Sequence, residues 1–136
     1  MLSPVFDLIG VTPEQFWDIT GSLVAEGYDR EIAYMQALCM VSRENGAMLS
    51  NSQIRTMGEQ LQFYEGFPEA LDRLKQIGNE NGYQIGIYVI TAGLEEMVSG
   101  STLGPYLTRC WGCGFAEDSD GSISHPMKIV TSANKV

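Results

Sequence analysis

A threonine at the end of an uncharged apolar segment is the residue of this sequence best placed to bind a ligand. Residues 84–91 are rich in β-branched side chains, which predicts a buried parallel strand ending at Thr91, with Ala92 and Gly93 as the loop that follows. Ligands of α/β sheets bind at the carboxyl edge of such strands. A hydroxyl there, beside amides that lead into a helix, can hold a phosphate oxygen through neutral donors. The alternative is that Thr91 only caps the next helix.

Two cysteines in a C-x-x-C pair, Cys110 and Cys113, offer a different chemistry. With His125, the single histidine, they leave a tetrahedral zinc site one ligand short unless a carboxylate joins them. A redox dithiol is expected at a helix N-terminus, whereas these cysteines fall in a predicted strand. We interpret them, with Cys39, as buried apolar side chains, and keep a small metal-binding protein as an alternative.

Acidic side chains in two further places have structural interpretations. Asp118 and Asp120 form an Asp-x-Asp string, but it is followed by Gly121 and lies between two strand-like segments, so it is interpreted as a polar hairpin turn. Glu95 and Glu96 open a predicted helix, where acids suit the helix dipole, and we expect them to be solvated. Neither pair is a candidate nucleophile.

The first half of the chain must supply helices. Thr12 and Gln15 form a capping box for one helix, Asp29 can cap a second, and Ser50 or Asn51 can cap a third. Apolar side chains recur at helical spacing after each cap. Residues 12–62 are therefore predicted to be helical, with short polar joints.

The second half has the order of an α/β unit. A helix is predicted over residues 68–78, then the strand of residues 84–91, a short helix, and a hairpin of residues 109–117 and 121–128. A lone parallel strand needs a partner. That partner must come from the hairpin, from another molecule, or from residues that this chain lacks.

Composition limits the classes of partner. Eight basic residues against seventeen acidic ones give a net charge of −9, which disfavours nucleic acid and anionic membranes. No apolar run has the length of a membrane span, and the first seven residues do not resemble a secretory signal. The odd cysteine count fits a disulfide framework poorly. We expect a globular cytoplasmic protein.

Three segments together carry a family resemblance. They are Phe63-Tyr64-Glu65-Gly66-Phe67-Pro68, which leads into a helix, then Val89-Ile90-Thr91-Ala92-Gly93, and finally Gly114-Phe115-Ala116-Glu117-Asp118. This pattern resembles the haloacid dehalogenase superfamily of phosphohydrolases from the exit of its cap to its second motif. The resemblance implies a helical cap domain over residues 1–62 and a partial Rossmann-like α/β core over residues 63–136.

The resemblance also implies roles for particular residues. Thr91, with Ala92 and Gly93, would bind a phosphoryl oxygen, and Lys135 would neutralise charge, with Lys128 as second choice. The substrate would be a small phosphomonoester, and the intact family uses Mg²⁺, although no cofactor is expected on this chain. A cap can line a substrate pocket, and the candidate side chains are Trp17, Tyr28, Tyr34, Met35 and Met40. The alternative, which is the more common case, is that they only pack between the helices.

The departures from the family pattern are equally important. No apolar strand ending in Asp-x-Asp precedes the cap, and no late acidic magnesium motif follows the core segment. We therefore expect an incomplete and inactive piece of such a hydrolase, because phosphoryl transfer needs all its parts together. The alternative from another class is a non-catalytic interaction module, which could form a homodimer through unpaired sheet edges.

Overall fold

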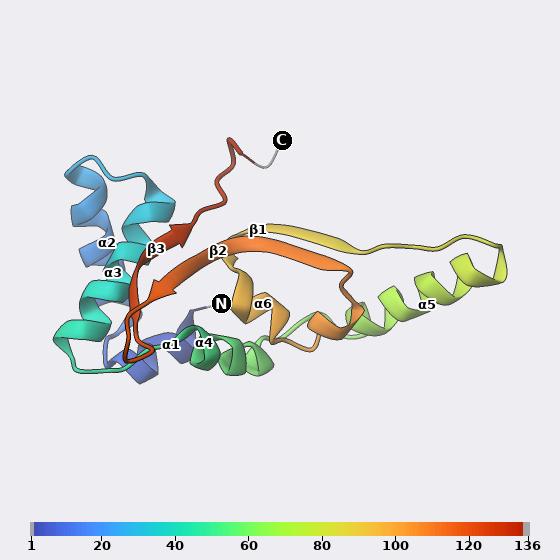
Figure 1. Cartoon of the computed structure of the whole chain (residues 1–136), viewed down its shortest axis with the longest axis horizontal. Coiled ribbons are helices and arrows are strands. Elements are labelled where there is room, and N and C mark those ends of the chain that lie inside the picture. Colours follow the sequence, from blue (N-terminus) through green and yellow to red (C-terminus); the bar gives the residue numbers. More distant parts are fainter. Residues whose placement is uncertain (1, 135–136) are drawn as a thin grey trace.

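The computed structural model describes residues 2–134 and has a mixed α/β fold, as the sequence predicts (Figure 1). Helices occupy the first half, and a three-stranded sheet with further helices occupies the second. In chain order the elements are α1 (Ser3–Ile9), α2 (Pro13–Ala25), α3 (Arg30–Glu44), α4 (Asn51–Met57), η1 (Gly58–Gln60), α5 (Phe67–Glu80), β1 (Tyr88–Leu94), α6 (Glu95–Ser99), η2 (Gly104–Tyr106), β2 (Arg109–Glu117) and β3 (Ile123–Lys128).

The starts of α2 and α4 are held by the capping boxes expected from the sequence. At α2 the Thr12 hydroxyl accepts from the Gln15 amide at 3.2 Å, and the Gln15 side chain accepts from the Thr12 amide at 3.0 Å. Ser50 and Gln53 do the same at α4, so Ser50 is the cap. Asp29 precedes α3 but makes no side-chain capping bond. The reciprocal bonds of the two capping boxes, at α2 and α4, satisfy amides that have no partner within the helix.

The three strands form one mixed sheet in the order β1-β2-β3. Strand β1 pairs with β2 in parallel, across α6, and β2 pairs with β3 as an antiparallel hairpin. The hairpin thus supplies the partner that the lone parallel strand needed. Strand β1 begins at Tyr88, later than the predicted residue 84, because β2 starts at Arg109 and no strand lies opposite residues 84–86.

One connected set of buried side chains joins the N-terminal helices to the sheet. Phe16, Leu38 and Ile54 from the helices belong to it together with Leu94 of β1 and Phe115 of β2. Next to this core the backbones that follow α4 and α6 lie close together. A Cβ added to Gly58, the first residue of η1, would lie 2.9 Å from the carbonyl carbon of Gly100, the residue that caps α6. The absence of a side chain there lets the two backbones approach.

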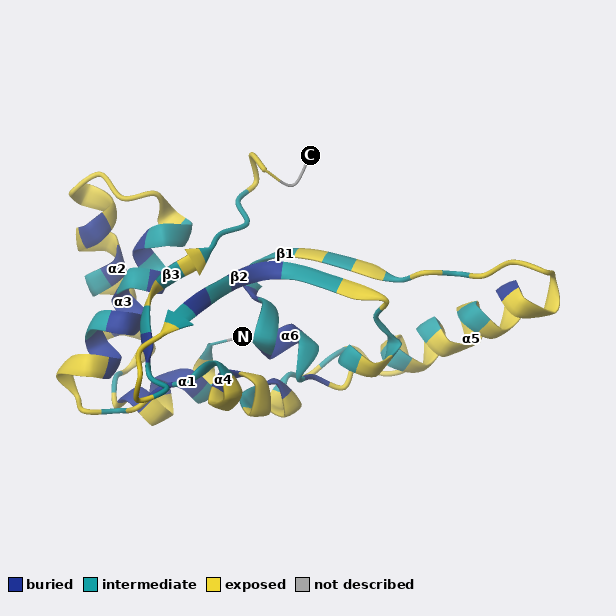
Figure 2. Cartoon of the chain, viewed as in Figure 1, coloured by how far each residue is buried: buried dark blue, intermediate teal, exposed yellow. Residues whose placement is uncertain are grey.

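Helix α5 extends away from the rest of the molecule (Figure 1), and its surface is largely exposed (Figure 2). Leu74 and Ile77, at helical spacing, are among its exposed apolar residues. Its described link to the body includes a bond from the Lys75 ammonium to the Tyr106 carbonyl oxygen at 2.6 Å. The arm formed by α5 and residues 81–87 therefore presents apolar surface that this chain leaves uncovered.

None of the helices within residues 2–134 combines the length and the apolar character needed to cross a lipid bilayer.

Candidate functional site

The carboxyl end of β1 departs from regular pairing where the sequence places its binding residue. Ile90 lies opposite Trp111 and Leu94 lies opposite Cys113, so three residues of β1 face Gly112 alone. The prediction that Ala92 and Gly93 form a loop is therefore wrong: both belong to β1. The irregularity, rather than a loop, accommodates the two extra residues.

Thr91 is half-buried within this irregular segment. Its hydroxyl oxygen accepts a hydrogen bond from the Gly93 amide at 2.9 Å. Among residues 2–134 its own hydroxyl proton has no acceptor, so the group can still donate to an oxygen of a ligand. The Gly93 amide, in contrast, is already used. Glu95 and Glu96 follow in α6, and their charge does not favour an anion at this place.

The Ala92 carbonyl connects β1 to the N-terminal helices. Tyr34 of α3 donates its hydroxyl proton to the Ala92 oxygen at 3.0 Å, and the Cys113 sulfur lies 3.3 Å from the same oxygen. Burial raises the pKa of the Tyr34 hydroxyl, and the neighbouring Cys113 raises it further. Tyr34 is therefore a neutral donor that holds α3 against the strand end.

A cleft of about 440 Å³ opens between α1, α2, α3 and this end of β1. Its lining residues are Leu2, Ser3, Phe6, Pro13, Trp17, Tyr34, Ala92, Gly93 and Leu94. The two residues that follow Thr91 thus form part of its wall, although Thr91 itself does not line it. The position at which the sequence predicts a ligand adjoins a concavity, and that concavity lies between the helical half and the sheet.

Only two of the five side chains named as candidates for a substrate pocket line the cleft. Trp17 and Tyr34 line the cleft, whereas Met35 is fully buried in the core. Tyr28 and Met40 are not lining residues. Sequence reasoning missed α1, which with its N-cap Leu2 supplies Leu2, Ser3 and Phe6 to the cleft. Its signals were Pro4 in the first turn and Gly10, a left-handed residue with φ 71° that ends the helix.

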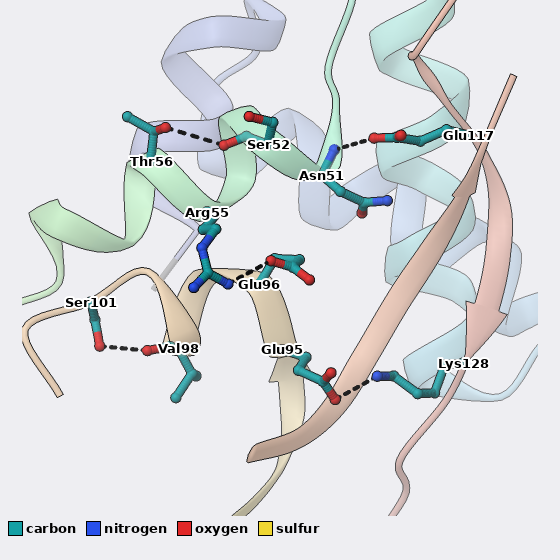
Figure 3. A network of polar contacts seen from close by, with 10 residues as sticks. All are labelled: Asn51, Ser52, Arg55, Thr56, Glu95, Glu96, Val98, Ser101, Glu117 and Lys128. Atoms are coloured by element: carbon teal, nitrogen blue, oxygen red, sulfur yellow. Dashed lines mark hydrogen bonds and ion pairs between the residues drawn. The ribbon is translucent and has the colours of Figure 1, made fainter. Parts of the chain in front are cut away.

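Glu95 is not the solvated side chain that its place in the first turn predicts (Figure 3). One of its carboxylate oxygens accepts from the Gly112 amide at 2.9 Å and lies 2.5 Å from the Lys128 ammonium. It therefore connects α6 to both other strands at the irregular end of β1. Glu96 pairs with Arg55 of α4 at 3.0 Å on the surface.

The structure describes one of the two lysines suggested by the family resemblance, Lys128. The charge of Lys128 is already paired with Glu95, which makes it a structural residue of the sheet. Lys135, the preferred choice, lies outside the described residues. The cleft itself is lined by no charged side chain within residues 2–134.

Two of the three cysteines take the buried positions expected of apolar residues. Cys39 and Cys113 are buried, Cys110 is half-buried, and none of the three is in a disulfide. Over residues 2–134, no three histidine, cysteine or acidic side chains gather as a metal site, so Cys110, Cys113 and His125 do not form one there. Burial raises the pKa of Cys39 to about 11 and also raises that of Cys110, which keeps both thiols protonated.

The Asp-x-Asp string forms the hairpin turn that the sequence predicts. The Asp118 amide donates to the Ser122 carbonyl at 2.8 Å, and the Gly121 amide donates to the Asp118 carbonyl at 2.9 Å. The Ser122 hydroxyl and amide donate to the Asp120 carboxylate at 2.6 and 2.9 Å, which lowers the pKa of Asp120. The Asp120 carboxylate and the Asp118 backbone thus stabilise an exposed turn between β2 and β3.

No family model matches the chain, and no solved structure matches it. The chain is similar to an uncharacterized protein of Borreliella burgdorferi, with 29% identity over 128 residues. That match covers 86% of this chain and 45% of the other protein, so the chain spans less than half the length of this relative.

Proposed function

We propose that this chain is part of a phosphohydrolase of the haloacid dehalogenase type that acts on a small phosphomonoester. In this proposal residues 1–62 are the helical cap and residues 63–136 are part of the core. The observation that carries it is the cleft between the N-terminal helices and the carboxyl end of β1, with Ala92 and Gly93 in its wall. Sheets of α/β proteins bind ligands at this edge, and an apolar cleft with a few polar groups is the usual form of a small-molecule site.

Within the proposal, Thr91 binds a phosphoryl oxygen through its unused hydroxyl proton, beside the backbone of Ala92 and Gly93. Lys135 supplies the positive charge that the described lining lacks. The residues present do not fit the family's Mg²⁺, because no carboxylate lines the cleft and no cluster of three possible ligands exists within residues 2–134. Nucleophile and metal ligands would have to come from polypeptide outside this sequence, so no catalytic step is assigned to it.

Two measurements on the 136-residue chain test this proposal. The chain should not hydrolyse an aryl phosphate in the presence of Mg²⁺, because positioning alone does not replace the missing nucleophile. Inorganic phosphate at millimolar concentration should nevertheless shift the amide resonances of residues 91–93. Thr91→Val should abolish those shifts, and Thr102→Val, at an exposed threonine away from the cleft, should not.

Either measurement can contradict the proposal. Turnover by this chain that disappears in Thr91→Val would show that the nucleophile lies within it. Phosphate shifts confined to other residues would show that the end of β1 is not the anion site.

A second candidate function, association with a second copy of this chain, rests on the exposed edge of β1. In the described sheet β1 has a neighbour on one side only. Tyr88 and Ile90 are 59% and 49% exposed, and residues 83–93 contain neither a charge nor a proline, the features that normally protect an edge. We expect a dimer in light scattering, and a monomer for Ile90→Lys. A wild-type monomer at every concentration would contradict this candidate.

We also propose a cytoplasmic location, which the three unpaired thiols support, since such compartments keep cysteines reduced. Cell fractionation with an antibody against the chain tests it, and recovery with secreted or membrane material would contradict it.

A further inference from the structure

We propose that the cleft at the end of β1 binds an uncharged aromatic or apolar group. This inference rests on the proposed function in one respect: the group would be the organic part of the phosphomonoester, with the phosphate toward Thr91. It adds the substrate class, which neither the sequence pattern nor the comparisons supply.

The first argument is the chemistry of the wall. Most of the described side chains that line the cleft are apolar or aromatic, and within residues 2–134 none is charged. The Tyr34 hydroxyl is committed to the Ala92 carbonyl, which leaves the Ser3 hydroxyl and the Trp17 indole N–H as the other polar side-chain groups of the described lining. A substrate whose organic part carries an ammonium or a carboxylate group would lose hydration here without gaining a partner of opposite charge. An uncharged group loses little and buries apolar surface.

The second argument is the state of Trp17. Its side chain is half-exposed, yet its indole packs against aromatic rings of α1 and α2. The ring of the fully buried Phe16 lies edge-to-face with the indole, with 5.1 Å between ring centroids and 78° between ring planes. The Phe6 ring has the same arrangement, with a centroid distance of 6.4 Å and an interplanar angle of 85°. A large apolar ring held in one orientation at the wall of a concavity is a preformed stacking surface.

The third argument is continuity between this surface and the strand end. Tyr34 lines the cleft with its ring while its hydroxyl bonds to Ala92, the residue next to Thr91. Ala92 and Gly93 belong to the same wall. In this inference the phosphate lies at Thr91, next to Ala92 and outside the lining, and the organic part lies in the cleft with Tyr34 and Trp17. The cleft volume of about 440 Å³ lies within the range of small-ligand pockets.

Titration calorimetry with four probes tests the inference on the 136-residue chain: 1-naphthol, 1-naphthyl phosphate, inorganic phosphate and phosphoserine. We expect 1-naphthol to bind and 1-naphthyl phosphate to bind more tightly than phosphoserine by at least about ten-fold, the effect of burying a ring against aromatic walls. Trp17→Ala should weaken 1-naphthol binding by about ten-fold. The matched control is Trp111→Ala, which removes the other tryptophan, one that stacks with Tyr88 on the sheet and does not line the cleft. It should leave binding unchanged.

A second measurement needs no variant, in case Trp17→Ala does not fold. Nuclear Overhauser contacts between naphthyl protons and the Trp17 indole should appear in the wild-type chain. Their absence, or affinity for 1-naphthyl phosphate no greater than for inorganic phosphate and unaffected by Trp17→Ala, would overturn the inference while leaving a phosphate site intact. Binding of 1-naphthol that depends on Trp17 but gains nothing from the phosphate would support the inference and contradict the proposed function.

Discussion

Gly112 offers the sharpest test of how the end of β1 is built. This residue of β2 faces the irregular segment of β1, and a Cβ placed on it would lie 2.9 Å from the Glu95 Cα, the Glu95 nitrogen and the Gly93 oxygen. All three are backbone atoms, so no side-chain rotation relieves the contacts. The Gly112 amide also donates to the Glu95 carboxylate, and that bond depends on the same close approach. Gly112→Ala should therefore separate β2 from the start of α6.

The expected cost follows from overpacking at a buried backbone contact, about 2 to 3 kcal/mol. For a chain of this size that corresponds to a decrease in Tm of roughly 10 °C. Thermal and urea unfolding followed by circular dichroism measure it. Gly114→Ala is the matched control, since a Cβ there would meet only the Lys128 side chain, at 3.6 Å or more. That variant should stay within about 0.5 kcal/mol of wild type.

The same variants test the link to the cleft. Gly112→Ala should shift the amide resonances of residues 91–95, because Gly93 and Glu95 must move to admit the methyl group. Equal stability of the Gly112 and Gly114 variants would refute the reasoning, because it would mean that the strand end tolerates a side chain where the structure allows none.

Three further predictions concern the charged and titratable groups. Glu95→Gln should destabilise the chain by about 1 kcal/mol in urea unfolding, because it weakens the bonds to the Gly112 amide of β2 and to Lys128 of β3. Glu96→Gln, at a surface ion pair, is the control and should change the free energy of unfolding by almost nothing. Equal losses of stability in the two variants would contradict this prediction. Cys39, with its pKa raised to about 11 by burial, should react with a thiol reagent at pH 8 only after unfolding, and labelling of the native chain at Cys39 would show that the site opens. The lowered pKa of Asp120 implies stability that is present above pH 3.8 and lost as the pH falls below it; Asp120→Asn should show less acid sensitivity, and an unchanged pH profile would rule out the Ser122 bonds as the cause.

Local sequence signals predicted most of the elements. The capping residues Thr12 and Ser50 mark helix starts because the bonds involved lie within four residues of the cap. The hairpin turn at residues 118–122 was predictable for the same reason. Helix α1 was not predicted, since a seven-residue helix carries a weak periodic signal and is stabilised by burying Val5, Phe6 and Ile9 against the other helices.

The candidate site was predictable only in part. Thr91 ends the apolar segment, and the structure places the two residues after it, Ala92 and Gly93, in the wall of a cleft. That a ligand binds there stays a prediction. The extent of β1 was not predictable, because it depends on where β2 begins and on the missing side chain at Gly112. Glu95 is a similar case: its position in a first turn predicts a solvated acid, and only the position of Lys128 shows otherwise.

Within this protein, composition and short-range pattern are sufficient to specify helices followed by an α/β unit and the turn of its hairpin. Those properties depend on hydrogen bonds and apolar spacing over a few neighbouring residues. The cleft is different, because Phe6, Trp17, Tyr34 and Gly93 come from four elements spread over much of the chain. Their meeting depends on the packing of α1, α2 and α3 on one another and on β1, and such long-range contacts have no signature in a single local segment.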